Sequence, residues 1–587
     1  MASPSSLEDE ELRQAIAMSL ANTSVHPGDE DDDDDVRRAI ALSLCQDTPS
    51  DAQTVPLPGS QVDSVMGSQA AACTDKLSQY APASATSKTS TQLLTDTSST
   101  SKPSEFLGLD RKAMESERLA RMGKRKRSAS PELPSKQPTK ARVAGPAAQQ
   151  STTDALQYPR GTVKRTWATK RPRSNDIKLE EVLQRNTLNI AVLSAFQFES
   201  TWFHENQIDP YQVKQIWIFS AKGEGLQEKL RREAAESQIP NFKMIFPPLP
   251  GQSLNMHGKL MLLFHPKHLR IVVPTANMIK EDWGETGNSW QPGVMENTVF
   301  LIDLPRRPDE KAAVEMDTNF GKEMFRYLKE QGVTQNVFEG LLKFDFGATA
   351  GFAFVHSIAG TTSGPERSRT GLPSLAKAIQ DLKLDDIDRL EIDYATSSLG
   401  ALKEPFMKQM YLAACGLSPL SDTKINVNIL DHFRVYFPTK ETVTNSTGGP
   451  DCGGIITLSR DFYNASTFPR QCLRDYQSTR PGLLSHNKLL FARGCKKDGT
   501  PIAWAYIGSA NLSEAAWGMQ KVLKSGKEGS SLVRNWECGV VVPVPAENLQ
   551  SVGSGIPPMS VFAGTVDIPF VYPASEYGGR EPWIFRG

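Results

Sequence analysis

The chain has 587 residues, a formal net charge of -1, 39% hydrophobic residues and 8% aromatic ones. The total charge says little, because it averages an acidic amino terminus against basic segments further on. No apolar run approaches the roughly 18 residues that cross a bilayer, and the amino terminus is acidic where a signal peptide is basic and then apolar. We therefore expect a soluble intracellular protein that acts as a monomer and has no membrane partner.

Cysteine usage points to the same compartment. The chain has seven cysteines, an odd number, and no Cys-x-x-Cys pair. They are Cys45, Cys73, Cys415, Cys452, Cys472, Cys495 and Cys538. Such scattered cysteines indicate a reducing compartment and argue against a zinc site.

A short pattern occurs twice near the amino terminus. Residues 8–20 end in Ala-Ile-Ala-Met-Ser-Leu, and residues 29–44 end in Ala-Ile-Ala-Leu-Ser-Leu. Each copy predicts a short amphipathic helix with acid at its start, over residues 8–22 and 31–46. Helices this short do not persist alone in water, so a partner is implied. The acid run followed by Ala-x-x-x-Ser resembles the ubiquitin-interacting motif, which implies ubiquitin or a ubiquitinated protein as partner. The alternative is two solvated acidic helices.

The first 155 residues are otherwise low in complexity and poor in aromatics, so they cannot bury enough apolar surface to offset chain entropy. We expect a disordered tail over residues 1–155. Basic clusters lie at Lys124–Arg127, Lys164-Arg165 and Lys170–Arg173. They predict nuclear import or a sequence-blind contact with nucleic acid, and ordinary linker charge is the alternative.

Strand and helix patterns then alternate in two similar rounds. The first round predicts strands at 188–193, 215–219, 255–264, 269–273 and 299–302, with helices at 226–237 and 310–331. The second predicts strands at 352–355, 390–392, 425–429, 483–491 and 536–540, with helices at 373–384 and 405–415. The pattern indicates an α/β fold of two similar lobes, 156–349 and 350–587, each a mixed sheet covered by helices and related by a pseudo-two-fold axis.

The triplet His-x-Lys occurs once in each lobe, and each copy is followed by a small-residue turn that ends in Asn. The two sets are His257, Lys259 and Asn277, and His486, Lys488 and Asn511. On an extended strand, residues two apart project from one face. Two imidazoles, two ammonium groups and two amides suit a phosphodiester that passes through a highly anionic state. No metal or other cofactor is required, since the lysines would neutralise the charge.

These motifs resemble the phospholipase D superfamily and, within it, the tyrosyl-DNA phosphodiesterases. The general superfamily pattern has Asp five residues after the Lys, where this chain has Phe264 and Arg493, and that absence is typical of the tyrosyl-DNA branch. Further similar segments are Ser397–Gly400, Ser485–Lys488, Gly508–Gly518, Trp536–Val540 and Asp567–Tyr572. The resemblance covers roughly residues 157–587.

The resemblance also implies a role for each motif residue. His257 would be the nucleophile that forms a phosphohistidine, and His486 would be the general acid and then the general base. The non-bridging phosphate oxygens would be held by Lys259, Lys488, Asn277 and Asn511. Glu537 resembles the carboxylate that orients the nucleophile, the alternative being a buried salt bridge with Arg534.

Three neighbouring residues are expected to contact the substrate, since short hydroxyls position DNA phosphates without reading sequence. They are Thr396, Ser397 and Ser398. The chain departs from the family in two places. The Gln that orients the general acid is absent, and Asn288 or Gln291 would replace it. The stacking aromatic shortly before the first His is also missing from residues 251–254.

We therefore predict a nuclear DNA-repair phosphodiesterase that frees a 3′ phosphate from a topoisomerase I-derived tyrosyl peptide on single- or double-stranded DNA. A phosphatidyl hydrolase is disfavoured by the two missing Asp residues. A non-catalytic adaptor for ubiquitin and DNA is disfavoured by the intact His, Lys and Asn pairs. Five histidines without a motif context are expected on the surface or in the core: His204, His265, His268, His356 and His432.

Overall fold

The structure is a computed structural model that describes residues 156–585, apart from 252, 286–292, 309–314, 363–368, 422–427, 522–528, 551 and 554. The two expected amino-terminal helices, the cluster at Lys124–Arg127 and both candidates for the missing Gln, Asn288 and Gln291, lie outside the described residues. No helix in the described part of the chain is both long and apolar enough to span a bilayer.

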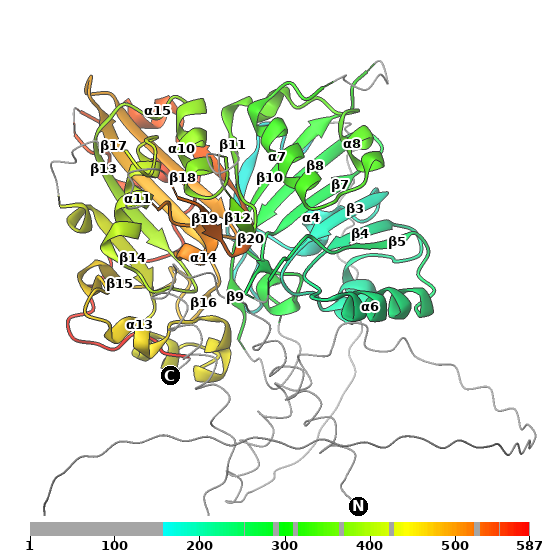
Figure 1. Ribbon diagram of the computed structural model, residues 1–587, viewed down its shortest axis with the longest axis horizontal. Helices are drawn as coiled ribbons and strands as arrows, with labels where there is room; N and C mark the ends of the chain where they lie inside the picture. Colours follow the sequence, from blue (N-terminus) through cyan, green and yellow to red (C-terminus); the bar gives the residue numbers. More distant parts are fainter. Residues whose placement is uncertain are drawn as a thin grey trace, which may run out of the picture. The chain divides into compact units, whose positions relative to one another are not determined.

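The first lobe is built on one mixed sheet with the strand order β2-β1-β10-β8-β7-β3-β4-β5 (Figure 1). Its central strand β7 is buried at every position, as expected for a strand covered on both faces. The strands are β1 (Thr162–Thr166), β2 (Asp176–Ile177), β3 (Ile190–Ser194), β4 (Lys214–Ile218), β5 (Phe242–Ile245), β7 (Leu260–Phe264), β8 (His268–Pro274) and β10 (Thr298–Pro305).

The second lobe repeats this sheet with the order β11-β20-β18-β17-β13-β14-β15. Each strand of this path corresponds to one strand of the first lobe, where only β2 has no counterpart. The order of antiparallel and parallel pairings along the two paths is the same. Its strands are β11 (Ala353–Ser357), β13 (Ile387–Ala395), β14 (Phe433–Phe437), β15 (Leu473–Asp475), β17 (Leu489–Lys496), β18 (Pro501–Gly508) and β20 (Asn535–Pro543). The predicted fold class, two similar lobes with mixed sheets, is confirmed.

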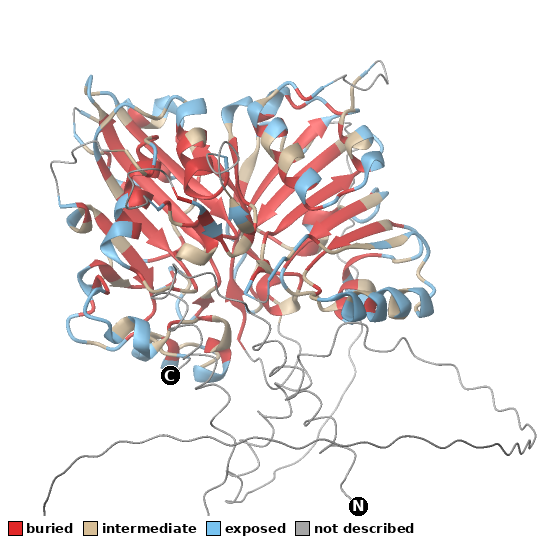
Figure 2. Ribbon diagram, in the orientation of Figure 1, coloured by how far each residue is buried: buried red, intermediate tan, exposed pale blue. Residues whose placement is uncertain are grey.

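Helices cover the sheets, and Figure 2 shows buried strands beneath helices whose outer faces are exposed. The α-helices are α4 (Leu179–Leu183), α5 (Ser200–Trp202), α6 (Glu224–Glu236), α7 (Asn319–Glu330), α8 (Gln335–Leu341), α10 (Leu372–Asp381), α11 (Glu404–Ala414), α12 (Lys440–Thr444), α13 (Arg460–Asn464), α14 (Glu514–Trp517) and α15 (Ala546–Leu549). Short 3-10 turns include η2 (Lys280–Trp283), η3 (Gly347–Gly351) and η4 (Ile429–His432). The predicted lobe boundary at 349/350 falls within η3.

One apolar core runs through the junction of the two lobes. Tyr327 of α7 lies 5.7 Å from Phe354 of β11 and 5.9 Å from Trp536 of β20, measured between ring centroids. All three belong to a single buried cluster that also contains residues of both sheets. Because the junction is as apolar as a lobe interior, it holds the lobes in a fixed relation around the residues between them.

Two sequence predictions of secondary structure are wrong. The helix expected over 310–331 is contradicted at residues 315–318, which are not helical, while 310–314 lie outside the described residues. The helix α7 begins at Asn319, because the Thr318 side chain accepts the Gly321 N–H and caps it there. The strand expected over 425–429 is contradicted at its described end, where Ile429 begins η4 and the strand β14 starts at Phe433.

The expected strands through the two His-x-Lys motifs are also wrong as continuous elements. The chain forms β6 (Asn255–Met256) before the first motif and β7 after it, and β16 (Leu484–Ser485) before the second motif and β17 after it. Each interruption has the same cause: the residues before the histidine pair with a strand of the other lobe. β6 pairs with β20, and β16 pairs with β9 (Met295–Glu296).

Candidate active site

The exchanged strand pairs place each motif histidine at the junction. The His257 N–H donates to the Trp536 carbonyl at 3.0 Å, and the His486 N–H donates to the Glu296 carbonyl at 2.9 Å. In both cases the histidine belongs to one lobe and its backbone partner to the other. The two motifs are therefore fixed relative to each other by backbone hydrogen bonds.

His257 is oriented by a carboxylate of the second lobe. Its Nδ1 lies 2.8 Å from Glu537 Oε2, and Glu537 Oε1 accepts from Asn535 Nδ2 at 3.0 Å. Burial lowers the pKa of His257, and the nearby lysines lower it further against the pull of Glu537. A neutral imidazole whose Nδ1–H is held by a carboxylate presents the Nε2 lone pair, the form a nucleophile needs. Glu537 has no ion pair with Arg534, so the alternative raised from sequence is wrong.

His486 is oriented by a carboxylate of the first lobe, and sequence reasoning missed this residue. Its Nδ1 lies 3.0 Å from Asp282 Oδ2, an oxygen that also accepts the Asn277 N–H at 2.7 Å. Burial lowers the pKa of His486 to about 4, with the lysines adding to the effect and Asp282 opposing it. Burial would raise the pKa of Asp282, but His486, Lys488 and the Asn277 N–H together lower it, so this carboxylate is ionised at neutral pH.

Two fully buried lysines flank these histidines. Lys259 Nζ donates to the His257 carbonyl at 2.7 Å, and Lys488 Nζ donates to the His486 carbonyl at 2.5 Å. Burial lowers the pKa of Lys259 to about 8, and burial together with Lys259 lowers that of Lys488 well below its ordinary value. Each lysine also lowers the pKa of the histidine in the opposite motif. Lys488 Nζ also donates to the Thr275 carbonyl at 3.4 Å, so the second motif reaches the turn that carries Asn277 and the two motifs form one site across the junction.

The two motif asparagines differ in how they are held. Asn511 Oδ1 accepts three hydrogen bonds, from Thr396 Oγ1 at 2.9 Å, Ser397 Oγ at 3.2 Å and the Ser398 N–H at 3.1 Å. Asn277 is fixed through its backbone, and its side-chain Oδ1 is buried with no hydrogen-bond partner among the described residues. The residues expected to contact DNA phosphates are thus the ones that bind Asn511.

A buried carboxylate holds the strand beside His486. Glu296 accepts from Ser478 Oγ at 2.7 Å and from the guanidinium groups of Arg165 and Arg480 at 2.9 and 2.7 Å. Arg165 comes from β1 of the first lobe, whereas Ser478 and Arg480 come from the second. Arg165, which the sequence places in a basic cluster, is therefore an internal ion-pair partner at this point of the junction.

Phe196 brings an exposed aromatic ring to the site. It follows β3, is 42% exposed, and its ring centroid lies 5.4 Å from that of His257. Residues 251–254, where sequence analysis looked for an aromatic, contain none. The ring beside the nucleophile thus comes from another segment, and it is free on one side to stack against a flat group of a ligand.

The five other histidines in the described part of the chain have ordinary hydrogen-bond partners, as core or surface residues do. The pairs are His204 with Gln215, His265 with Thr187, His268 with Gln184, His356 with Glu323, and His432 with Glu391. In the described part of the chain no three His, Cys, Asp or Glu side chains are grouped as metal ligands.

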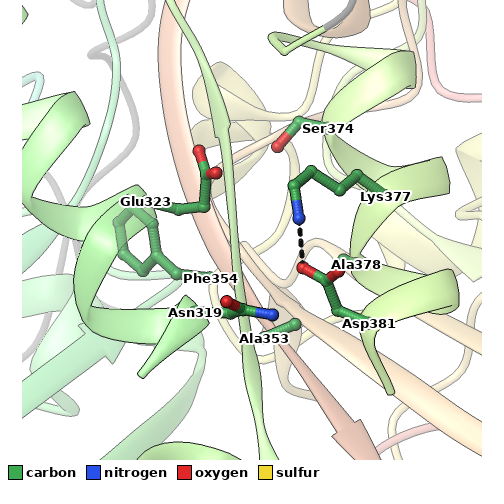
Figure 3. A pocket seen from close by; sticks show the side chains of 8 residues that line it. All are labelled: Asn319, Glu323, Ala353, Phe354, Ser374, Lys377, Ala378 and Asp381. Atoms are coloured by element: carbon green, nitrogen blue, oxygen red, sulfur yellow. Dashed lines mark hydrogen bonds and ion pairs between the residues drawn. The ribbon is translucent and has the colours of Figure 1, made fainter. Parts of the chain in front are cut away.

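A separate cavity lies between α7, β11 and α10 (Figure 3). It measures about 10 Å³, room for roughly one water molecule. Its lining includes the ion pair of Lys377 and Asp381 at 2.5 Å, and it contains no motif residue. It is too small for a substrate.

Taken together, the site offers two imidazoles, each held at Nδ1 by a carboxylate, together with two lysine side chains and amide donors. This set can attack a phosphorus atom with one imidazole and move a proton with the other, while lysines and amides hold the non-bridging oxygens. Each imidazole depends on a carboxylate of the other lobe. The arrangement therefore requires both lobes.

Comparison with known proteins points to one family. The family model described as tyrosyl-DNA phosphodiesterase matches residues 162–578, and the ubiquitin interaction motif matches residues 8–23 and 31–44. The chain is 24% identical over 391 residues to tyrosyl-DNA phosphodiesterase 1 of Arabidopsis thaliana, covering 63% of this chain and 59% of that protein. It is 24% identical over 344 residues to tyrosyl-DNA phosphodiesterase 1 of Drosophila melanogaster, covering 55% and 56%. The chain thus spans less than two thirds of these relatives.

A solved structure shares the fold. The crystal structure of the yeast tyrosyl-DNA phosphodiesterase superposes with a TM-score of 0.52 at 18% identity, covering 72% of this chain and 100% of that one. At this level of identity the likeness concerns the fold, and it extends over both lobes.

Proposed function

Because the chain belongs to the tyrosyl-DNA phosphodiesterase family, we propose that it hydrolyses the bond between a DNA 3′ phosphate and a tyrosyl peptide derived from topoisomerase I, as a step of DNA repair. The observation that carries this proposal is the reciprocal pairing of His257 with Glu537 and His486 with Asp282. It gives two imidazoles that both present Nε2 and that come from opposite lobes, an arrangement that supports attack by one and proton transfer by the other at a phosphorus atom between them.

In the first step His257 Nε2 attacks the phosphorus. The new P–N bond forms as the bond from phosphorus to the tyrosine oxygen breaks, and His486 gives its proton to the leaving phenolate. In the second step His486, now neutral, takes a proton from water, and the water oxygen displaces His257 from phosphorus. The products are a DNA 3′ phosphate and a free tyrosyl peptide.

The lysines and asparagines act on the charge of the phosphate. Lys259 and Lys488, with the amides of Asn277 and Asn511, hold the non-bridging oxygens through both steps. Burial is the largest cause of the lowered pKa of His486, and the two lysines add to it. An anion bound between the lysines offsets their charge, which raises this pKa and favours the protonated form that the general acid needs.

The direct test is turnover of a 3′-phosphotyrosyl oligonucleotide, followed by gel mobility and mass spectrometry, with phosphatidylcholine as the competing substrate. We expect release of tyrosine with excess EDTA present, since no step requires a metal. His257→Ala should abolish turnover, and His486→Asn should accumulate DNA covalently bound to His257. A folded His486→Asn protein without adduct, or hydrolysis of phosphatidylcholine in preference to the oligonucleotide, would contradict the proposal.

The amino-terminal repeats support a second interaction. Their match to the ubiquitin interaction motif over residues 8–23 and 31–44 supports binding of ubiquitin or a ubiquitinated protein, and the basic cluster at Lys124–Arg127 supports nuclear import. Deleting residues 1–50 should remove capture by ubiquitin resin and leave turnover intact. Unchanged capture would contradict this role.

A further inference from the structure

Three consecutive residues after β13 direct their donors at one atom. Thr396 Oγ1, Ser397 Oγ and the Ser398 N–H all lie within 3.2 Å of Asn511 Oδ1. A backbone N–H can only donate, so the atom it meets must be the amide oxygen and not the amide nitrogen. The Thr396 hydroxyl has one proton, which it shares between Asn511 Oδ1 and the Ser398 carbonyl, also at 2.9 Å. The Ser398 N–H and the Ser397 hydroxyl, with this shared donor, therefore fix the rotation of the Asn511 amide and leave its NH₂ group as the group that can face a ligand.

The two hydroxyls of this cluster are internal. Thr396 is 4% exposed and Ser397 is 1% exposed. Thr396 Oγ1 also accepts the Leu512 N–H at 3.3 Å, which ties the 396–398 segment to the turn that carries Asn511. A DNA phosphate needs an accessible donor, and these hydroxyls are covered. Their burial argues against the direct phosphate contact expected from the sequence.

The equivalent asparagine lacks such a cluster. Asn277 is fixed by its backbone N–H, while its side-chain Oδ1 has no hydrogen-bond partner among the described residues. The corresponding turns of the two lobes thus carry one rotationally fixed amide and one that no donor among the described residues fixes. A fixed donor needs no reorganisation when charge develops on a phosphate oxygen, which is the condition for transition-state stabilisation.

Resting on the proposed function, we propose that Thr396 and Ser397 are positioning residues that lock the Asn511 amide as a permanent hydrogen-bond donor to the reacting phosphate, and that they do not themselves bind DNA. Their contribution then passes entirely through Asn511. Substituting them should therefore lower the rate on any 3′ aryl phosphodiester, whatever the length of the attached DNA.

The test uses the full chain, the double variant Thr396→Val with Ser397→Ala, and two substrates. One is thymidine 3′-(4-nitrophenyl phosphate), which has no phosphate besides the reacting one, and the other is an oligonucleotide with the same 3′ ester. We expect kcat/KM to fall by about 3- to 30-fold on both substrates, since each neutral hydrogen bond contributes modestly. Thr396→Ser should restore the Thr396 part of the loss, and Thr361→Val, at an exposed threonine, serves as the matched control.

The same double substitution is then made in an Asn511→Ala background. If the hydroxyls act through Asn511, they should cause no further loss there, because the group they position is gone. A loss confined to the oligonucleotide, expressed in KM and persisting in the Asn511→Ala background, would mean direct contact with DNA and would overturn the proposal.

Calorimetric binding of inorganic phosphate separates this proposal from the proposed function, because it needs no turnover. The double variant should weaken phosphate binding about as much as Asn511→Ala does. If the double variant keeps the wild-type melting temperature and the wild-type affinity for phosphate, Thr396 and Ser397 do not position Asn511. This conclusion would hold even if neither ester proved to be a substrate. Failure of the wild-type protein to cleave either ester, with the phosphate result intact, would refute only the proposed function.

Discussion

Asp282 is the residue whose substitution most directly tests the cooperation between the two lobes. It belongs to the first lobe, is fully buried, and accepts the Nδ1–H of His486 in the second. In Asp282→Asn the side-chain oxygen can keep both hydrogen bonds, so the geometry of the site survives. What disappears is the negative charge beside the imidazole.

The loss can be estimated from the contact distance. The Nδ1 to Oδ2 separation is 3.0 Å, which places the two charge centres about 4 Å apart when His486 is protonated. Opposite charges at about 4 Å attract by about 4 kcal/mol at an effective dielectric constant of about 20. About 1.36 kcal/mol corresponds to a tenfold change in rate. Losing this attraction therefore slows the steps whose transition states place positive charge on His486 by about 10³-fold.

The assay exploits the leaving group. 4-Nitrophenolate leaves without protonation, so on a 4-nitrophenyl ester the first step needs no general acid and only hydrolysis of the phosphohistidine slows. We expect a burst of about one nitrophenolate per active site followed by turnover reduced about 10³-fold. Asp451→Asn, at an exposed aspartate, is the matched control. If Asp282→Asn shows no burst and its steady-state turnover is within threefold of wild type, the proposed role of the Asp282–His486 pair is refuted.

Three further outcomes follow from the site. The pKa of Lys259 is lowered to about 8, and only its charged form can hold a phosphate oxygen, so kcat/KM should fall as pH rises through about 8. A pH–rate profile that stays flat up to about pH 10 would contradict this. Phe196→Ala should raise KM for a 3′-phosphotyrosyl oligonucleotide about tenfold by removing a stacking face, with Phe196→Tyr as the conservative control, and equal steady-state kinetics for all three proteins would exclude stacking. Glu296→Ala should lower the free energy of unfolding by about 3–5 kcal/mol, because two guanidinium groups lose their buried carboxylate. Urea denaturation measures this, with Glu339→Ala at an exposed site as the control. Equal unfolding midpoints for the two variants would refute the prediction.

The sequence was sufficient for the parts of the fold that local patterns encode. Apolar runs such as Leu260–Phe264 are confirmed as buried strands, and the repeated order of strands and helices is confirmed as two sheets of the same topology. The family resemblance, carried by His257, His486 and their neighbours, is confirmed by the match over residues 162–578.

What the sequence could not supply depends on distant pairings. The two-residue strand β6 has no periodicity of its own, and only its pairing with β20 shows that the chain changes sheets before His257. Asp282 stands five residues after Asn277 in a short turn, where an acid has no distinctive signal. The sequence predicts that Thr396 and Ser397 contact DNA, because it does not show which way a hydroxyl in a loop points. In the structure both hydroxyls are buried and contact Asn511.

The exchanged strand pairs also bear on how the protein is made. His257 and Glu537 are separated by 280 residues and His486 and Asp282 by 204, so both contacts close very long loops. Non-local contacts of this kind form late in folding. A nascent chain that has not yet released β20 from the ribosome holds His257 without Glu537. On the proposed mechanism, such a chain lacks the carboxylate that orients its nucleophile.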